Sequence, residues 1–143
     1  GQTEGKTAFL LFKRTKLEEF LQKNDSLEIL KSSGYEEFSF GSILLKFKER
    51  YTTYITQQGM QFPHEMGLLL GYPAEDVEGF ISNEGKNSLY CGYWKVYKNV
   101  AAKKRIFDEF EKSKECIIQL LADDIDMQLI LEIYKDEPRK VAV

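Results

Sequence analysis

The single histidine and one of the two cysteines are the residues of this 143-residue chain best suited to catalysis. An imidazole next to a carboxylate can act as a general base near neutral pH, and His64 is followed directly by Glu65. A thiol becomes a nucleophile when nearby positive charge lowers its pKa, and Cys91 lies close in sequence to Lys86 and Lys95. The candidate catalytic pair is therefore Cys91 as nucleophile and His64 as base.

Each of these residues also has an ordinary structural explanation. A histidine that follows Pro63 can hydrogen-bond to backbone at the entrance of a strand, and Glu65 would then point to the other side of the chain. A cysteine within a strand is often a small buried hydrophobic side chain. Cys91 and Cys116 are 25 positions apart, which fits no metal-ligand spacing. We therefore expect no metal site, and the sequence leaves any cofactor open.

A second group of residues could bind a ligand. The Gly85-Lys86-Asn87 turn could hold an anion through backbone N–H groups and an ammonium, although it lacks the glycine spacing of a P-loop. The same turn could simply end a helix. Aromatic residues beside a lysine could stack a planar ligand or anchor a partner, and a packed aromatic face explains them equally well. The candidate ligand-binding residues are Lys86, Asn87, Tyr93, Trp94, Lys95 and Glu65.

Composition narrows the class of partner and the compartment. The net charge is -3, and the short basic run 103–105 is followed at once by acidic residues, so we expect no nucleic-acid partner. We find no signal peptide and no apolar run long enough to cross a bilayer, so we expect no membrane association. Two cysteines without a pairing pattern favour free thiols and a cytoplasmic location.

Hydrophobic spacing predicts strands that alternate with helices. Short apolar runs predict four strands, at 6–13, 66–70, 89–98 and 116–121. Capping residues and apolar steps of three and four predict helices that start near Thr15, Asp25, Ser39, Pro73 and Asn99. Segment 125–135 fits a helix or a strand, and we prefer a helix. The predicted fold is a single α/β domain over 1–143, with a mostly parallel sheet of about four strands and helices on both faces.

This arrangement brings the candidate residues to one edge of the sheet. If strands 66–70 and 89–98 are parallel neighbours, His64 and the 85–87 turn both precede a strand and share an edge. The segment 71–73 would lie at the opposite edge, where open α/β sheets usually bind ligands. Two candidate edges therefore compete.

Several motifs resemble an uncharacterised bacterial family, the domain of unknown function DUF3793. The matching segments are FPHE at 62–65, GYP at 71–73, EDV at 75–77, GFI at 79–81, GKN at 85–87 and CGYWKVY at 91–97. The similarity covers most of the chain up to about Leu120. Members of the family often have a second cysteine where this chain has Ser88, which argues against a dithiol role here. We also expect that the family's longer N-terminal region is absent, and that the tail after Asp136 is frayed.

The family has no assigned activity, so the resemblance does not by itself give a function. Our first hypothesis is a cytosolic binding or regulatory module for a small molecule or a partner protein. The alternative is an enzyme that uses Cys91 as nucleophile with His64 as base and Lys86 as the group that holds an anionic substrate. An exposed sheet edge would also allow a homodimer.

Overall fold

The computed structural model describes residues 14–123 and 125–134, and this part of the chain is mostly helical. Helices make up 64% of the structure, and the described strands form one two-stranded antiparallel sheet. In chain order the elements are α1 (Arg14–Leu21), α2 (Asn24–Ser32), α3 (Phe40–Thr56), α4 (Met66–Leu69), α5 (Ala74–Ser82), β1 (Tyr90–Cys91), β2 (Lys95–Val96), α6 (Val100–Ala122) and α7 (Met127–Tyr134).

The predicted α/β fold with a mostly parallel sheet is therefore wrong. The run 66–70 forms the short helix α4, and the run 116–121 is part of α6. A short continuous apolar run does not distinguish a strand from a helix, because it lacks the periodicity that marks either one. The first predicted strand, 6–13, and the tail after Asp136 lie outside the described residues.

The third predicted strand, 89–98, is a hairpin. Tyr90 pairs with Val96 and Cys91 pairs with Lys95, with the chain reversing between them. Gly92 stands at the reversal because any side chain there would collide with Phe107 of α6, whose ring would come within 2.4 Å of a Cβ atom. The aromatic composition indicated a strand correctly, but the glycine inside the run marked the turn that divides it.

Most of the helix predictions are confirmed. The helix from Ser39 is α3, and the Ser39 hydroxyl accepts a hydrogen bond from the Ser42 N–H, as an N-cap does. The helix near Pro73 is α5, which carries Glu75 and Asp76 in its first turn. Segment 127–134 is helical, as preferred. Thr15 lies inside α1 instead of capping it.

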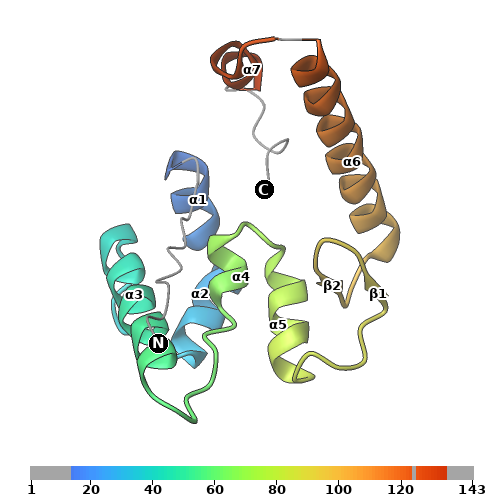
Figure 1. Cartoon of the computed structure of the whole chain (residues 1–143). Helices are drawn as coiled ribbons and strands as arrows, with labels where there is room; N and C mark the ends of the chain where they lie inside the picture. Colours follow the sequence, from blue (N-terminus) through green and yellow to red (C-terminus); the bar gives the residue numbers. More distant parts are fainter. Residues whose placement is uncertain (1–13, 124, 135–143) are drawn as a thin grey trace, which may run out of the picture.

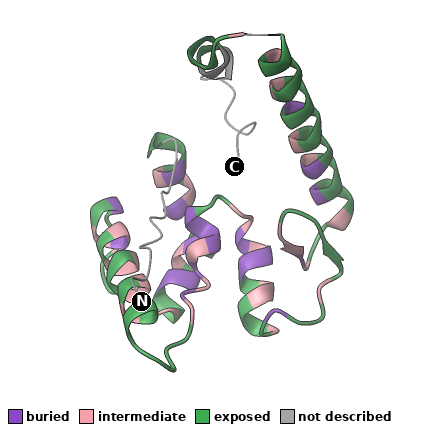
Figure 2. Ribbon diagram, viewed as in Figure 1, coloured by how far each residue is buried: buried purple, intermediate pink, exposed green. Residues whose placement is uncertain are grey.

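The hydrophobic core lies among α1 to α5. Leu21, Leu30, Ile43 and Leu68 are almost fully buried and come from four different helices. Figure 2 shows their buried faces turned toward one another around α4. In Figure 1 the hairpin and α6 lie on the far side of α5 from this core, and α7 stands at the distal end of α6. Helix α5 is thus the element that joins the helical core to the hairpin.

A buried carboxylate on α5 fixes the hairpin and α6 in place. The Asp76 side chain is 2% exposed. It accepts hydrogen bonds from the Trp94 indole N–H at 2.8 Å and from the Tyr97 backbone N–H at 2.8 Å, and it faces the Lys103 ammonium at 3.6 Å. A buried carboxylate needs such partners because its desolvation is costly. Asp76 therefore connects α5, the hairpin and α6 through one side chain.

Candidate functional site

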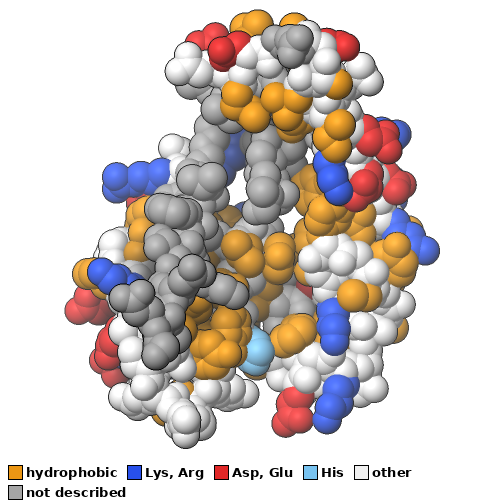
Figure 3. Space-filling model, viewed as in Figure 1, with side chains coloured by type: hydrophobic (Ala, Val, Ile, Leu, Met, Phe, Trp, Pro, Cys, Tyr) orange, Lys and Arg blue, Asp and Glu red, His pale blue; other side chains and the backbone are white. Residues whose placement is uncertain are grey.

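His64 lies in the turn before α4, between two aromatic rings. Its ring centroid is 5.4 Å from that of Phe62 and 5.0 Å from that of Phe80 on α5. The imidazole is half-buried, and within the described residues its ring nitrogens make no hydrogen bond to protein. In Figure 3 the histidine reaches the surface as a pale blue patch with hydrophobic side chains on both sides. Both ring nitrogens are therefore free to contact a ligand.

Lys95 reaches the same aromatic ring from the hairpin. Its ammonium lies 5.8 Å from the Phe80 ring centroid and donates a hydrogen bond of 2.6 Å to the Gly85 carbonyl. A lysine ammonium has three donors, so two remain after this bond. The His64 ring and the Lys95 ammonium both lie against Phe80, at 5.0 and 5.8 Å from its ring centroid. The two groups are therefore no farther apart than these two distances added together. We call Phe62, His64, Phe80 and Lys95 the His64 ledge.

Glu65 is placed away from the surface. Its side chain is 3% exposed and accepts hydrogen bonds from the Arg50 guanidinium at 2.6 Å and the Tyr35 hydroxyl at 3.1 Å. Burial, with Glu65 next to it, raises the pKa of Tyr35 well above its usual value, so this hydroxyl stays protonated and keeps donating. Glu65 therefore joins the turn before α4 to α3, and it makes no hydrogen bond to the His64 imidazole.

The 85–87 turn is a helix-ending turn in which Lys86 and Asn87 are exposed. Gly85 and Asn87 both have positive φ, of 71° and 57°. The Gly85 and Lys86 carbonyls are occupied by Lys95 and by the Tyr97 hydroxyl. The Lys86 side chain is 77% exposed, with its ammonium 3.9 Å from Glu84. A helix-ending turn thus accounts for the backbone here, and of the two lysines it is Lys95 that lies against the same aromatic ring as His64.

Tyr93 and Trp94 pack against α6. Trp94 stacks on Tyr72 at 4.9 Å and meets Phe107 edge-on at 4.5 Å. The Tyr93 hydroxyl donates to Glu111, and this bond raises the pKa of Tyr93. These contacts attach the hairpin to α6 and to Tyr72. They match the packed aromatic face that the sequence offered as the alternative to a ligand-binding surface.

Cys91 is exposed on β1 and is not a buried hydrophobic side chain. Among the described residues no hydrogen bond links its sulfur to His64, so the contact that the cysteine mechanism needs is not formed. In the same part of the chain no group of three or more His, Cys, Asp or Glu side chains is arranged to hold a metal ion.

Sequence reasoning missed two residues that organise this region. Asp76 was noted only as part of the EDV motif at 75–77, and Lys103 only as part of the short basic run 103–105. Lys103 is in fact 4% exposed and forms ion pairs with Glu75 and Asp76. Its hydrogen bond holds the pKa of Glu75 below the ordinary value. The available signal was the helical spacing from Lys103 to Phe107, which puts both on one face of α6.

Comparison with known proteins identifies the family. The model of the family described as "Protein of unknown function (DUF3793)" matches residues 1–131. The chain belongs to the DUF3793 family. Searches of curated proteins and of solved structures found no significant match. The resemblance carried by the motifs between 62 and 97 is thus confirmed, and these DUF3793 motifs form the turn before α4, α5 and the hairpin.

The structure gives these DUF3793 motifs physical roles. A Cβ atom at Gly67 would lie 2.8 Å from Val77, and one at Gly79 would lie 2.4 Å from the Tyr97 ring. These two glycines allow α4 and the hairpin to approach α5 closely. No helix in the described ranges of this DUF3793 chain is long and apolar enough to cross a membrane.

Proposed function

We propose that this protein is a binding module whose ligand carries an acidic group on an apolar or aromatic body. The single observation that carries the proposal is the His64 imidazole, which is held between two aromatic rings while neither of its nitrogens has a hydrogen-bond partner among the described residues. A histidine with a purely structural role usually uses at least one nitrogen in a hydrogen bond.

The surroundings of the imidazole support an acidic ligand. Lys95, which also lies against Phe80, offers two further ammonium donors, and the nearest carboxylate in sequence, Glu65, is already neutralised by Arg50. The Phe62 and Phe80 rings supply an apolar surface for the rest of the ligand. The acidic group could belong to a small molecule or to an acidic segment of a partner protein. In both cases a carboxylate or similar anion would lie beside an apolar surface.

Charge and thiol exposure bear on the partner and the compartment. Net negative charge argues against a nucleic-acid partner, and two exposed free thiols favour a reducing, cytoplasmic compartment. A homodimer stays a prediction, although the extended sheet edge on which it rested is replaced by strands of two residues. The cysteine-based enzyme is not preferred, because Cys91 and His64 make no contact with each other.

The test is a titration with sodium benzoate and, separately, with an acidic peptide that contains Phe-Asp pairs, followed by the NMR signals of the His64 ring and, in every variant, of the Phe80 ring. We expect saturable shifts with at least one of the two probes, and the responding probe identifies the source of the acidic group. His64→Phe keeps the ring packing but removes both nitrogens, and Lys95→Ala removes the ammonium. Each substitution should weaken binding roughly five- to thirtyfold, because a hydrogen bond to a charged group contributes about 1–2 kcal/mol at a partly exposed site.

Lys86→Ala is the matched control. It removes a lysine from the same region, but that side chain is exposed and faces Glu84, so binding should not change. Lys95→Arg keeps the charge and should retain most of the affinity. Thermal unfolding of each variant shows whether loss of the Lys95 bond to Gly85 has disturbed the fold. The proposal is wrong if neither probe shifts the His64 signals, or if Lys86→Ala weakens binding as much as Lys95→Ala does.

A further inference from the structure

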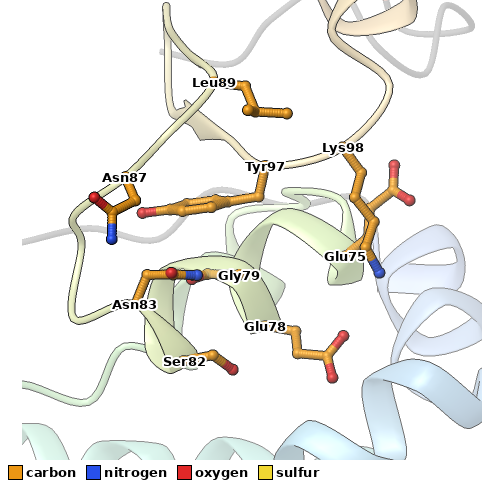
Figure 4. Close-up of a pocket in the computed structure, with 9 residues that line it drawn as sticks. All are labelled: Glu75, Glu78, Gly79, Ser82, Asn83, Asn87, Leu89, Tyr97 and Lys98. Atoms are coloured by element: carbon orange, nitrogen blue, oxygen red, sulfur yellow. The ribbon is translucent and has the colours of Figure 1, made fainter.

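A concave surface lies on the flank of α5 that carries Gly79. It is an open hollow of 370 Å³ between α5 and the segment on either side of the hairpin. Its volume falls within the range of about 300–1,000 Å³ that is usual for small-molecule sites. The residues that line it, drawn in Figure 4, are Glu75, Glu78, Gly79, Ser82, Asn83, Asn87, Leu89, Tyr97 and Lys98.

The Tyr97 ring forms a fixed aromatic wall of this hollow. Its Cβ and Cγ atoms lie so close to Gly79 that even a methyl group there would collide, at 2.5 and 2.4 Å. Its hydroxyl donates to the Lys86 carbonyl at 3.0 Å, and its backbone N–H donates to Asp76. Figure 4 shows the ring with Gly79 on one side and the exposed Leu89 on the other. The ring is therefore held in one orientation without a ligand.

Polar groups on the rim are available for hydrogen bonds. The side chains of Glu78, Ser82 and Asn87 make no hydrogen bond to the described residues. Asn83 uses its amide nitrogen on the Gly79 carbonyl at 2.7 Å, which leaves its side-chain oxygen as an acceptor. The rim thus offers a hydroxyl, two amides and a carboxylate around one aromatic ring.

The charges around the hollow disfavour a strongly charged ligand. The Glu75 carboxylate is already paired with Lys103 and hydrogen-bonded by Asn99, so it lines the hollow without adding an unpaired charge. Glu78 and Lys98 remain, and their opposite charges nearly cancel. An uncharged ligand rich in hydroxyl groups can use donors and acceptors of both kinds, and its apolar C–H face can lie against an aromatic ring.

We propose that this hollow is a second binding site, for an uncharged, hydroxyl-bearing ring such as a monosaccharide unit. The site is separate from the His64 ledge in both residues and ligand chemistry, because the ledge presents cationic donors and takes an acid. Either site can therefore be present without the other.

The experiment is an NMR titration of the whole chain with D-glucose, D-galactose, D-mannose and N-acetyl-D-glucosamine. We expect saturable shifts of the Tyr97 ring and of the Asn83 and Asn87 side-chain amides with at least one sugar. An affinity of about millimolar is expected for one sugar ring, given about 0.3 kcal/mol per ligand atom. Sodium benzoate should leave these signals unchanged.

Two variants locate the binding. Asn87→Gly removes the amide while suiting the positive φ at that position, and Glu78→Ala removes an exposed carboxylate from α5. Each should weaken sugar binding at least threefold. Glu28→Ala on α2 is the matched control, since it removes an exposed helical glutamate away from the hollow, and it should have no effect. The proposal is overturned if no sugar shifts these signals, or if Glu28→Ala weakens binding as much as Glu78→Ala does.

Discussion

At the scale of single residues, Asp76 contributes more to the architecture than any residue first considered for catalysis. Its two oxygens accept three backbone or indole N–H groups and face one ammonium, all from segments that follow α5 in the chain. His64 differs in that its ring nitrogens bind nothing in the described protein. The Asp76 carboxylate has its partners inside the protein and therefore stabilises the fold. The His64 nitrogens remain available to bind a ligand.

Replacing Asp76 should therefore show how strongly the hairpin is attached. In Asp76→Asn the amide would place a donor against the Trp94 N–H or the Lys103 ammonium and would leave the part-buried Glu75 as the counter-charge of Lys103. We expect the free energy of unfolding to fall by about 1–3 kcal/mol, the usual cost of leaving a buried donor unsatisfied. Urea unfolding followed by Trp94 fluorescence measures this loss. A loss below about 1 kcal/mol, the size expected of an exposed pair, would contradict the role given to Asp76.

At the scale of elements, α5 is the helix on which the rest depends. One face packs on α2 and α4 and the other receives the hairpin, while its C-terminal turn places Gly85 beside Phe80. Both proposed sites lie on its flanks, one through Phe80 and one through Gly79. The sequence signals for this helix were good, since an acidic first turn followed Pro73.

A pair of glycine substitutions tests the close approach to α5. Gly79→Ala would push the Tyr97 ring away and should destabilise the protein by about 1–3 kcal/mol, as overpacking does, despite the better helix propensity of alanine. Gly41→Ala on α3 has nothing within 4 Å of the added methyl group and should stabilise by up to about 1 kcal/mol. Chemical denaturation of both variants measures the contrast. Equal effects in the two would show that Tyr97 does not pack on Gly79.

At the scale of the whole molecule, packing density decreases along α6. Its buried residues are Lys103, Phe107 and Ser113, and none of its residues beyond Ser113 is buried. In Figure 1 the distal part of α6 and the following α7 extend away from the helical core. Large apolar side chains are exposed there, including Ile118, Leu121, Met127 and Leu129.

Hydrogen exchange should report this gradient. Backbone amides of residues 114–122 should exchange at least tenfold faster than those of 103–110, because local opening there disrupts few buried contacts. Native-state exchange measured by NMR or mass spectrometry gives both rates. Equal protection along the whole of α6 would contradict this prediction and would indicate that the distal apolar side chains are covered in solution.

The sequence alone determined the local features of this protein. The caps and spacing of α3, the acidic start of α5, the helical preference of 127–134 and the family itself follow from signals contained within short stretches. Tertiary structure decided the fold class, because the apolar runs at 66–70 and 116–121 are equally compatible with strand or helix until their neighbours are known. It also decided the sites. Phe80, Gly79 and Asp76 acquire their roles from residues that follow them by 15 to 27 positions, and no local pattern specifies which of these long-range contacts will form.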